Sequence, residues 1–527
     1  MAWQRLELIW HYLEKWAAER PTAEAVVFEN TRLTWGQLKE KVDQTAQAFL
    51  ELGVRQGDRV ATLAMARPEF LITYLAAGKV GAMWLGLSPK FTAPELDFLL
   101  GDSRPRVLVA VGEFQDQDLT PLLRNLLTRH DFLQKILVLG EPAEGLPSFE
   151  EFIAAARPRG AADLERRAAL VSPTDEVLLM YTSGSTGKPK GVVHTHASIL
   201  ANIAVELEKF LFDGEMRMLL HFPINHVAAD VEVTVAGLMA GGCLVMMDKF
   251  DPADSLEVIA REKVTALGQI PAMFLLQFRD PSFSPAKLAS VRQFIWAGAA
   301  APRLMIEVLS QVCQATGAQM LTGYGSTEVG GFVTYTAVGD GLDRLASSAG
   351  QIAPPFELQI VDEDHQPLPV GEVGEIAVRG PFLMKGYYQN PQATAQVVDP
   401  EGWYYTSDLA KQDEAGYIYI AGRSSEMFKS GGENVYPREV EDVIEHHPGV
   451  LMSAVISQPH EVYGEVGWAF VMPRPGQEVK EEELAQICRS HLANFKIPKR
   501  FVVRPLLPLL PNGKVDKLAL RREAANL

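Results

Sequence analysis

The sequence predicts an α/β protein with a large N-terminal domain and a small C-terminal domain. Apolar runs typical of strands alternate with helical patterns through most of the first 420 or so residues, as where Val60–Ala64 is followed by Glu69–Val80. This alternation is typical of βα units and of sheets that are largely parallel. A chain of 527 residues is also too long for one hydrophobic core, which favours at least two domains.

The same alternation continues along the N-terminal part of the chain. A strand over Arg106–Ala110 is followed by a helix over Leu119–Leu127, and another helix is predicted near residue 200. The apolar residues of this later helix recur at helical spacing, and we interpret most of them as a core-facing stripe without a chemical role. They are Ile199, Leu200, Ile203, Leu207, Phe210 and Leu211.

The pattern changes from about Gly350 onward. Short strands separated by Gly and Pro predict a compact, β-barrel-like module, and a boundary follows near Gly422–Glu426. We therefore expect a domain over residues 1–424, made of two α/β subdomains and this module, and a small α+β domain over residues 425–527. The predicted strands are Phe356–Val361, Gly374–Val378, Tyr417–Ile420, Ala454–Ile456 and Trp468–Val471, and the predicted C-terminal helices are Glu439–His446 and Glu481–Leu492.

Bulk properties exclude several classes of function. A net charge of −17 argues against nucleic acid or an anionic membrane as the main partner. Three widely spaced cysteines, Cys243, Cys313 and Cys488, form no disulfide framework or metal cluster and fit a reducing compartment. No uncharged run reaches transmembrane length. We expect a soluble cytoplasmic protein with no membrane span; its oligomeric state stays open, with a homodimer among the alternatives.

The segment Tyr181–Gly191 is rich in groups that bind phosphate. It holds five hydroxyl side chains, three glycines and two lysines, and it follows the apolar run Val177–Met180. Glycines let backbone N–H groups approach phosphate oxygens closely, so this loop is suited to a polyphosphate. It is not a Walker loop, because Thr182 replaces the first glycine and Pro189 follows Lys188, which leaves no hydroxyl for magnesium.

Further motifs follow the loop in an order that carries a family resemblance. They are His221–His226, Trp296–Pro302, Gly323–Glu328, Tyr405–Asp408, Gly422–Arg423, Phe428–Pro437 and Pro511–Lys517. Together with the loop they resemble the adenylate-forming superfamily, which includes acyl-CoA synthetases, adenylation domains of peptide synthetases and insect luciferases. The resemblance runs from the loop almost to the C-terminus. It implies an acyl-CoA synthetase-like fold in which the small C-terminal domain acts as a mobile lid.

The resemblance implies a nucleotide site built from four segments. Tyr324 would stack on adenine, Thr327 would reach the α-phosphate, Glu328 would help to hold Mg²⁺, and Asp408 and Arg423 would bind the ribose. The chemistry agrees, since an aromatic face binds a base, hard carboxylate oxygens suit magnesium, and an ionised aspartate offers two acceptors to a diol. The other implied nucleotide-binding residues are Thr182, Ser183, Gly184, Ser185, Thr186, Gly187, Lys188, Lys190, Gly298, Ala299, Ala300, Gly323, Gly325 and Ser326.

The resemblance also implies catalytic groups outside the nucleotide site. Lys514 would bridge the substrate carboxylate and the α-phosphate, and His226 would line the acyl pocket as a positioning or gating residue. Lys429 would enter the active site only for thioester formation, on a coenzyme A-binding loop made of Ser430, Gly431, Gly432 and Glu433. The sequence departs from the family at the hinge, where Ser425 stands instead of the usual Asp or Lys. Serine still permits the backbone rotation that a hinge needs.

These residues predict an ATP-dependent ligase that makes an acyl-AMP and then an acyl-CoA, with ATP, Mg²⁺ and coenzyme A as its cofactors and co-substrates. AMP and pyrophosphate would be released. The alternatives are a luciferase-like enzyme, an enzyme that passes the acyl group to a carrier protein, and a non-catalytic nucleotide-binding protein. The last is disfavoured because the lysines, Glu328 and Asp408 are all present.

Three glycines bear on the size of the acid. The acetate-using branch of the family has a tryptophan where this chain has Gly325, and Gly330–Gly331 leaves further volume unfilled. We therefore expect a medium-sized carboxylic acid, either aromatic, alicyclic or medium-chain aliphatic. Asp230, close to His226, is interpreted as a solvated helix residue rather than as a pocket residue.

Overall fold

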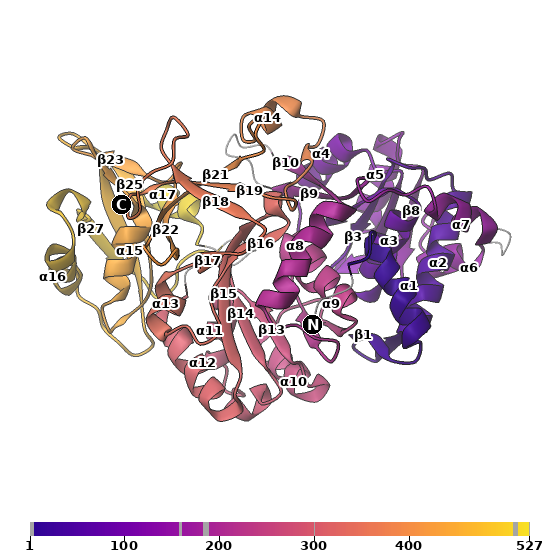
Figure 1. The fold of residues 1–527 in the computed structure, drawn as a ribbon, viewed down its shortest axis with the longest axis horizontal. Helices are drawn as coiled ribbons and strands as arrows, with labels where there is room; N and C mark the ends of the chain where they lie inside the picture. The colour runs from indigo at the N-terminus through magenta and orange to yellow at the C-terminus, as the bar shows by residue number, and fades with distance from the viewer. Residues whose placement is uncertain (1–4, 157–160, 183–188, 300, 510–514, 526) are drawn as a thin grey trace.

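Two large sheets build the N-terminal part of the protein in its computed structural model (Figure 1). The structure describes residues 5–156, 161–182, 189–299, 301–509, 515–525 and 527. A four-stranded antiparallel sheet and a C-terminal domain complete the molecule. Mixed α/β architecture with a large N-terminal and a small C-terminal part confirms the predicted fold class.

The seven-stranded sheet carries the segment that was predicted to bind phosphate. Its strands are parallel from β9 through β4, β3 and β5 to β8, whereas β10 and β20 add an antiparallel edge. In sheet order they are β20 (Gly386–Tyr387), β10 (Lys190–Thr195), β9 (Glu176–Thr182), β4 (Met83–Leu87), β3 (Arg59–Leu63), β5 (Val107–Val111) and β8 (Lys135–Leu139).

The helices in the first 170 residues follow the predicted alternation. The predicted helix Glu69–Val80 is α3. Its first residue is a proline, and the helix is buried along most of its length. These helices are α1 (Ile9–Glu19), α2 (Trp35–Glu51), α3 (Pro68–Lys79), α4 (Ala93–Ser103), α5 (Thr120–Arg129), α6 (Phe149–Ala154) and α7 (Ala161–Ala168). A small hairpin, β6 (Glu113–Phe114) with β7 (Gln117–Asp118), lies outside the sheets.

The nine-stranded sheet carries the second group of predicted motifs. Its centre is parallel, and antiparallel pairs form both of its edges. In sheet order the strands are β17 (Gln351–Ile352), β16 (Gly331–Tyr335), β15 (Gln319–Ser326), β14 (Gln293–Trp296), β13 (Ala266–Gln269), β11 (Arg217–Leu220), β12 (Cys243–Met246), β1 (Glu24–Phe28) and β2 (Thr31–Thr34).

Helix α8 (His196–Lys209) lies between the two large sheets (Figure 1). The predicted apolar stripe on it is buried from Ile199 to Phe210, which confirms its role in the core. Leu211 is the exception: it is 43% exposed, because the helix ends at Lys209 and Leu211 turns away with φ at +57°. The chain then reaches a short π-helix, η2 (Ala228–Val233), which packs against α8.

The remaining helices of the N-terminal part flank the nine-stranded sheet. They are α9 (Thr234–Ala240), α10 (Pro252–Glu262), α11 (Pro271–Arg279), α12 (Arg303–Thr316) and α13 (Leu342–Ser347), with the 3₁₀ turns η3 (Pro285–Leu288) and η4 (Thr327–Val329). Among the helices of the described residues, none is long and apolar enough to cross a membrane.

The predicted β module is an open antiparallel sheet rather than a closed barrel, because its strand order does not pair the first strand with the last. Its strands are β18 (Glu357–Val361), β19 (Gly374–Arg379), β21 (Tyr404–Gln412) and β22 (Ile418–Arg423), and α14 (Pro391–Ala395) lies beside β20. The C-terminal domain contains β23 (Phe428–Ser430), β24 (Glu433–Val435), β25 (Val450–His460), β26 (Gly464–Pro473), β27 (Arg500–Val503), α15 (Pro437–Glu445), α16 (Glu481–His491), η5 (Asn494–Lys496) and α17 (Lys517–Ala524).

Candidate active site

The phosphate-binding segment is carried by an antiparallel hairpin. Thr182 ends β9, Lys190 begins β10, and the two residues pair directly with each other. Both ends of the predicted loop are therefore held by the seven-stranded sheet. The other predicted loop residues, namely Ser183, Gly184, Ser185, Thr186, Gly187 and Lys188, lie outside the described residues.

Tyr387 joins this hairpin to the Thr327–Glu328 motif. It lies on β20 and pairs with Val192 of β10, and the ammonium of Lys190 lies 5.0 Å from the centre of its ring. Its hydroxyl donates a hydrogen bond of 3.1 Å to Oε1 of Glu328. The N–H of Met384 also donates to the carbonyl oxygen of Glu328 at 2.8 Å. Two motifs that are far apart in the sequence therefore meet at one tyrosine.

His194 also contacts the Thr327–Glu328 motif. It lies on β10 and is fully buried, and this burial lowers its pKa to about 4, so the ring is neutral near pH 7. Its Nε2 lies 2.7 Å from the carbonyl oxygen of Thr327, and since a carbonyl can only accept, Nε2 carries the proton. A Cβ on Gly330, which has φ at +67°, would lie 3.1 Å from the ring. The backbone at Thr327 is thus held in place by a buried donor.

Asp408 connects the tyrosine and the arginine that were predicted to bind the nucleoside. The hydroxyl of Tyr324 donates to Oδ2 of Asp408 at 2.7 Å, and Nε of Arg423 donates to Oδ1 at 3.0 Å. Asp408 and Arg423 face each other on β21 and β22. The Asp408 carboxylate raises the pKa of Arg423, and burial followed by Asp408 raises the pKa of the Tyr324 hydroxyl. Three predicted residues from three strands therefore form one cluster.

The small residues predicted to accommodate adenine form a turn and not a strand. β14 ends at Trp296, and Gly298 and Ala299 lie exposed in the bend that follows, with Gly298 at φ +81°. Ala300 lies outside the described residues. The bend is at the carboxyl end of a parallel strand, the edge of a sheet where ligands usually bind. The position of Gly298 and Ala299 at the sheet edge therefore suits a ligand.

His226 precedes the π-helix η2 and is exposed. The N–H of Ala228 donates to its Nδ1 at 3.2 Å. Asp230 was expected to be a solvated helix residue, and this is wrong: it is fully buried, and neither of its carboxylate oxygens has a hydrogen-bond partner among the described residues. It is buried because η2 packs against α8 and β11 and continues into α9, where a surface helix was expected.

The glycines near Glu328 do not leave the open volume that the sequence suggested. A Cβ on Gly325 would lie 1.9 Å from the carbonyl oxygen of Gly331. A Cβ on Gly331 would lie 2.4 Å from Oε1 of Glu206, and Gly330 packs against His194. These glycines allow β15, β16 and α8 to approach closely, so the space beside them is already filled.

The predicted thioester loop is the tip of a C-terminal hairpin. Lys429 is exposed on β23, Glu433 begins β24, and Gly431 and Gly432 have φ at +64° and +92°. The N–H of Gly431 donates to the carbonyl oxygen of Tyr463 at 2.9 Å, and Ser430 is buried. Among the described residues, no hydrogen bond or ion pair joins this hairpin to the Tyr324–Asp408 cluster.

Ser425 lies exposed in the turn between β22 and β23. Its neighbour Glu426 forms an ion pair with Lys517, whose ammonium is 2.7 Å from Oε2 of Glu426 and 2.9 Å from Oε1 of Glu441. Lys517 begins α17, so this pair ties the expected hinge to the segment that follows Lys514. Lys514 itself lies outside the described residues.

Sequence reasoning missed three residues that the structure brings to the site. Neither Tyr387 nor His194 belongs to a motif that the sequence analysis found. They contact the Thr327–Glu328 motif because strand pairing brings distant segments of the chain together. Glu206 did leave a signal: it falls three residues after Ile203 and four before Phe210, on the core face of α8. A charged residue inside an apolar stripe is rarely buried without a reason.

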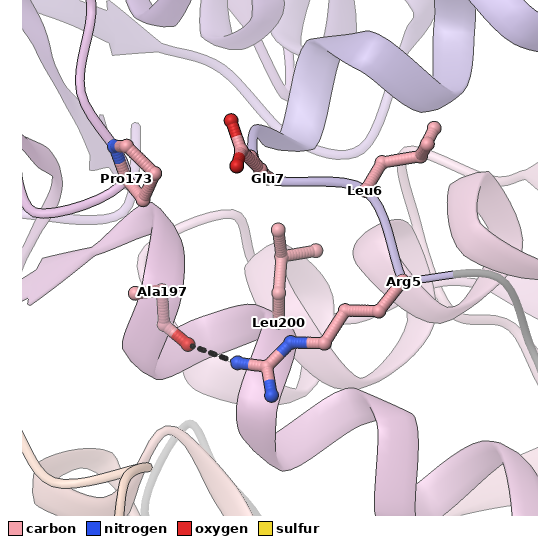
Figure 2. Close-up of a pocket in the computed structure, with 6 residues that line it drawn as sticks. All are labelled: Arg5, Leu6, Glu7, Pro173, Ala197 and Leu200. Carbon is pink, nitrogen blue, oxygen red and sulfur yellow. Dashed lines mark hydrogen bonds between the residues drawn. The ribbon is translucent and has the colours of Figure 1, made fainter.

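A separate pocket of about 340 Å³ lies between the N-terminal segment and the start of α8 (Figure 2). Arg5 closes one side by donating to the carbonyl oxygen of Ala197 at 3.4 Å. It contains none of the predicted site residues, and we assign it no function. Its lining residues are Arg5, Leu6, Glu7, Pro173, Ala197 and Leu200.

Known proteins resemble this chain in sequence over most of its length. The sequence model of the family described as AMP-binding enzyme matches residues 13–388, and that of the AMP-binding enzyme C-terminal domain matches residues 439–514. A feruloyl-CoA synthase of Amycolatopsis sp is 34% identical over 97% of this chain and 98% of its own length. The mitochondrial medium-chain acyl-CoA ligase ACSF2 of Rattus norvegicus is 30% identical over 97% of this chain and 86% of its own.

A solved structure extends the likeness to the whole fold. The crystal structure of the anthranilate CoA ligase AuaEII in complex with anthranoyl-AMP matches with a TM-score of 0.88 and 26% identity. The match covers 100% of this chain and 99% of that one.

Proposed function

Since the chain belongs to the family of AMP-binding enzymes and is an AMP-forming acid–thiol ligase, we propose that it joins a medium-sized aromatic, alicyclic or medium-chain carboxylic acid to coenzyme A. ATP and coenzyme A are its co-substrates. The relatives named for feruloyl and medium-chain acyl groups and the neighbour bound to anthranoyl-AMP support this size of acid. The observation that carries the site is the meeting of the Lys190 hairpin and Glu328 at Tyr387.

The first half-reaction joins the acid to the α-phosphorus of ATP. An oxygen of the carboxylate forms a bond to this phosphorus, the bond from phosphorus to the bridging oxygen of the β-phosphate breaks, and pyrophosphate leaves. The attack brings negative charges together: two unit charges about 4 Å apart repel by about 4 kcal/mol at an effective dielectric of about 20. Lys514 and the lysines Lys188 and Lys190 would offset this repulsion and stabilise the transition state.

The nucleoside would be held by the cluster around Asp408. Its carboxylate would accept hydrogen bonds from the ribose hydroxyls, with Arg423 keeping it ionised, and Tyr324 would present its ring to adenine. The turn at Gly298 and Ala299, with Ala300, Gly323, Gly325 and Ser326, would complete the base site. His226 would position the acid near the α-phosphate.

Glu328 fits a role in holding Mg²⁺, since the ion is commonly bound by one or two carboxylates together with the phosphates of the substrate. Tyr387 bonds one oxygen of this carboxylate and would orient it. When bound, the ion neutralises charge on the phosphates. Thr327, whose carbonyl is fixed by His194, would contact the α-phosphate.

The second half-reaction transfers the acyl group to sulfur. The thiol sulfur of coenzyme A attacks the carbonyl carbon of the acyl-AMP, the bond from that carbon to the phosphate oxygen breaks, AMP leaves, and the thiol proton passes to solvent. We propose that residues 425–527 rotate about Ser425 relative to residues 1–424. This would withdraw Lys514 and bring in Lys429 with Ser430, Gly431, Gly432 and Glu433. The exposed turn at Ser425 supports a pivot there.

An acid panel tests the function. Purified protein with ATP and Mg²⁺ is given acetate, benzoate, cyclohexanecarboxylate or octanoate, and AMP release is measured with and without coenzyme A. We expect acid-dependent AMP release that coenzyme A strongly increases, with the lowest kcat/KM for acetate. No acid-dependent AMP or pyrophosphate would contradict the ligase, and adenylation that coenzyme A leaves unchanged would favour transfer to a carrier protein. A preference for acetate would contradict the size of the acid.

Location and assembly complete the proposal. A cytoplasmic enzyme without a nucleic-acid partner agrees with the net charge of −17. Light scattering of the purified protein decides between a monomer and a homodimer.

A further inference from the structure

Two carboxyl groups that the proposed reaction does not use lie close together behind strand β16. Glu206, on α8, is 1% exposed, and Glu232, on η2, keeps part of its surface accessible although protein atoms surround its carboxyl. Burial and then the charge of Glu232 raise the pKa of Glu206, and burial followed by both carboxyl groups raises the pKa of Tyr335 on β16. The three elements that carry these side chains, α8, η2 and β16, pack against one another.

The hydrogen bonds of Glu206 are incomplete. Its Oε1 accepts the N–H of Phe332 at 3.0 Å, while its Oε2 has no hydrogen-bond partner among the described residues. Asn202, one turn earlier on α8 and fully buried, donates through Nδ2 to the carbonyl oxygens of Val329 and Phe332, both at 2.9 Å. Its Oδ1 likewise has no partner in the described chain.

The unpartnered amide oxygen of Asn202 faces Gly331, as the carboxyl of Glu206 does. A Cβ built on Gly331 would lie 2.4 Å from Oε1 of Glu206 and 2.9 Å from Oδ1 of Asn202, so both oxygens surround one point. Oε2 of Glu206 and Oδ1 of Asn202 thus lie here without hydrogen-bond partners among the described residues. A buried polar group left without a hydrogen bond destabilises the protein.

Among the described residues, no lysine or arginine pairs with these acids. The influences on the pKa of Glu206 are burial, Glu232 and the N–H of Phe332, and for Glu232 burial alone raises the pKa to about 8. This contrasts with Asp408, whose charge is paired with Arg423. The described residues around Glu206 and Glu232 therefore do not supply a hydrogen-bond donor for Oε2 of Glu206 or for the carboxyl of Glu232.

The pair is attached to both ends of the proposed reaction site. Glu232 follows His226 by six residues, on a π-helix, a distortion that often occurs at functional sites. Glu206 bonds Phe332, which follows Glu328 by four residues. A group held by Glu206 and Glu232 would thus lie beside the chain segments that carry His226 and Glu328.

Open space exists on the same face of the nine-stranded sheet. Tyr335 pairs with Gly323 on β15, so the two share a face, and that face continues through Leu321 and Ile295 to Gly268 on β13. A Cβ built on Gly268 would meet nothing within 4 Å. A glycine inside a strand often marks the close approach of a ligand.

We propose that Glu206 and Glu232 bind the far end of the acid substrate, and that this acid carries a hydrogen-bond donor, a hydroxyl or an amino group, remote from its carboxylate. The inference rests on the proposed ligase function and names the substrate class within it. A donor on the acid would satisfy Oε2 of Glu206 and the carboxyl of Glu232. An acid without such a donor would leave both groups unpaired when water is displaced.

Matched acids test the inference. The wild-type enzyme is assayed for acyl-CoA formation with 4-hydroxycinnamate, 4-aminocinnamate, 4-methoxycinnamate and cinnamate, and with 8-hydroxyoctanoate and octanoate. We expect the donor-bearing member of at least one series to have a kcat/KM about 10- to 100-fold above its matched acids, the range for a buried polar group that is left without a hydrogen bond when the donor is missing. The methoxy acid separates donation from mere size, and the amino acid separates an amine from a hydroxyl.

Variants assign the preference to the two residues. Glu206→Gln keeps an acceptor for the N–H of Phe332, and Glu232→Gln removes the second carboxyl. Each is expected to reduce the preference, the ratio of kcat/KM for the hydroxy acid to that for its matched acid, to about threefold or less. Glu208→Gln, exposed on the same helix, is the matched control and should keep the full preference. Calorimetric Kd values for non-hydrolysable acyl-AMP analogues of the hydroxy and methoxy acids give a readout without turnover.

The outcomes separate the two proposals. If no acid of any kind yields AMP, the ligase function fails. If the acids react but hydroxy, amino and methoxy members are equivalent, or if both glutamine variants keep the preference, only this inference is overturned. Should Glu206→Gln fail to fold, Glu232→Gln decides by the same criterion.

Discussion

Strands β15 and β16 separate two clusters of ionisable groups, which differ in whether the carboxyl oxygens have hydrogen-bond partners. On the face of Tyr324, the carboxylate of Asp408 is satisfied by a tyrosine hydroxyl and an arginine. On the face of Tyr335, Glu206 has an oxygen without a hydrogen-bond partner, and none of the described lysines and arginines pairs with it. The first cluster is complete within the protein and can exchange its partners for a ribose. The second needs a donor from elsewhere.

The difference shows where ligand specificity can be read from a structure. A paired charge indicates a site that is stable when empty, while an unpaired buried acid destabilises the empty protein and is retained where a ligand compensates it. We propose that the nucleotide binds on the paired side. The acid, which differs between the relatives named for feruloyl and medium-chain acyl groups, is assigned by the same proposal to the unpaired side.

The largest expected effect comes from the lysine of the adenylation step. Lys514→Ala should lower the rate of pyrophosphate release by at least about 100-fold, because the charge that stabilises the transition state is lost. ATP affinity, measured by calorimetry, and circular dichroism should change little. Lys411→Ala, an exposed lysine of β21 with no assigned role, is the control. Full pyrophosphate release by Lys514→Ala would contradict the assigned role.

Removing the paired carboxylate should sharpen the contrast between the two faces. Asp408→Ala is expected to weaken ATP binding by about 10- to 100-fold, since it removes the acceptors for the ribose and leaves Arg423 unpaired. Wild-type protein should bind 3′-deoxy-ATP more weakly than ATP, and this difference should vanish in the variant. If the variant still distinguishes the two nucleotides, Asp408 does not contact the ribose.

A smaller effect is expected at the tyrosine that joins the two motifs. Tyr387→Phe removes the hydrogen bond to Glu328, so the Mg²⁺ concentration for half-maximal activity should rise by about three- to tenfold. Tyr388→Phe is the matched control, because the Tyr388 hydroxyl accepts a hydrogen bond from Gln389 instead. Equal Mg²⁺ dependence of both variants would argue against orientation of Glu328 by Tyr387.

The unpaired acid should also give a pH signature in stability. The pKa of Glu232 is raised from 4.5 to about 8, so between these values the folded protein keeps a proton that the unfolded chain releases. Its contribution to the free energy of unfolding is therefore largest below pH 4.5 and falls as the pH rises toward about 8. Glu232→Gln has no such proton, so its Tm minus that of the wild type should grow between about pH 5 and pH 8.

Buried histidines act in the opposite direction and should cancel in this comparison. Burial lowers the pKa of His194 and His221 to about 4 and that of His196 to about 3, so their contribution is lost as the pH falls below 6.5. Both proteins carry these histidines. A Tm difference that stays constant across the range would contradict an unpaired carboxyl at Glu232.

The sequence predicted most of what local patterns encode. The strand and helix alternation, the core stripe of α8 and the order of the nucleotide motifs all follow from spacing and residue type. Asp230 was misjudged because its burial depends on where η2 packs, and the local sequence resembles a surface helix. Gly325 and Gly331 were misjudged because an absent side chain was equated with volume, although a neighbouring strand and helix fill it. The contact between Tyr387 and Glu328 could not be predicted, because it depends on the pairing of β20 with β10.

The most direct test of the central claim follows an oxygen atom. The acid preferred in the panel is prepared with oxygen-18 in its carboxylate and incubated with ATP, Mg²⁺ and coenzyme A. Mass spectrometry of the products should find one labelled oxygen in the phosphate of AMP and none in pyrophosphate, because the acid's own oxygen bonds the α-phosphorus and stays there when sulfur takes the acyl group. Unlabelled AMP, or label in pyrophosphate, would contradict activation through an acyl-AMP.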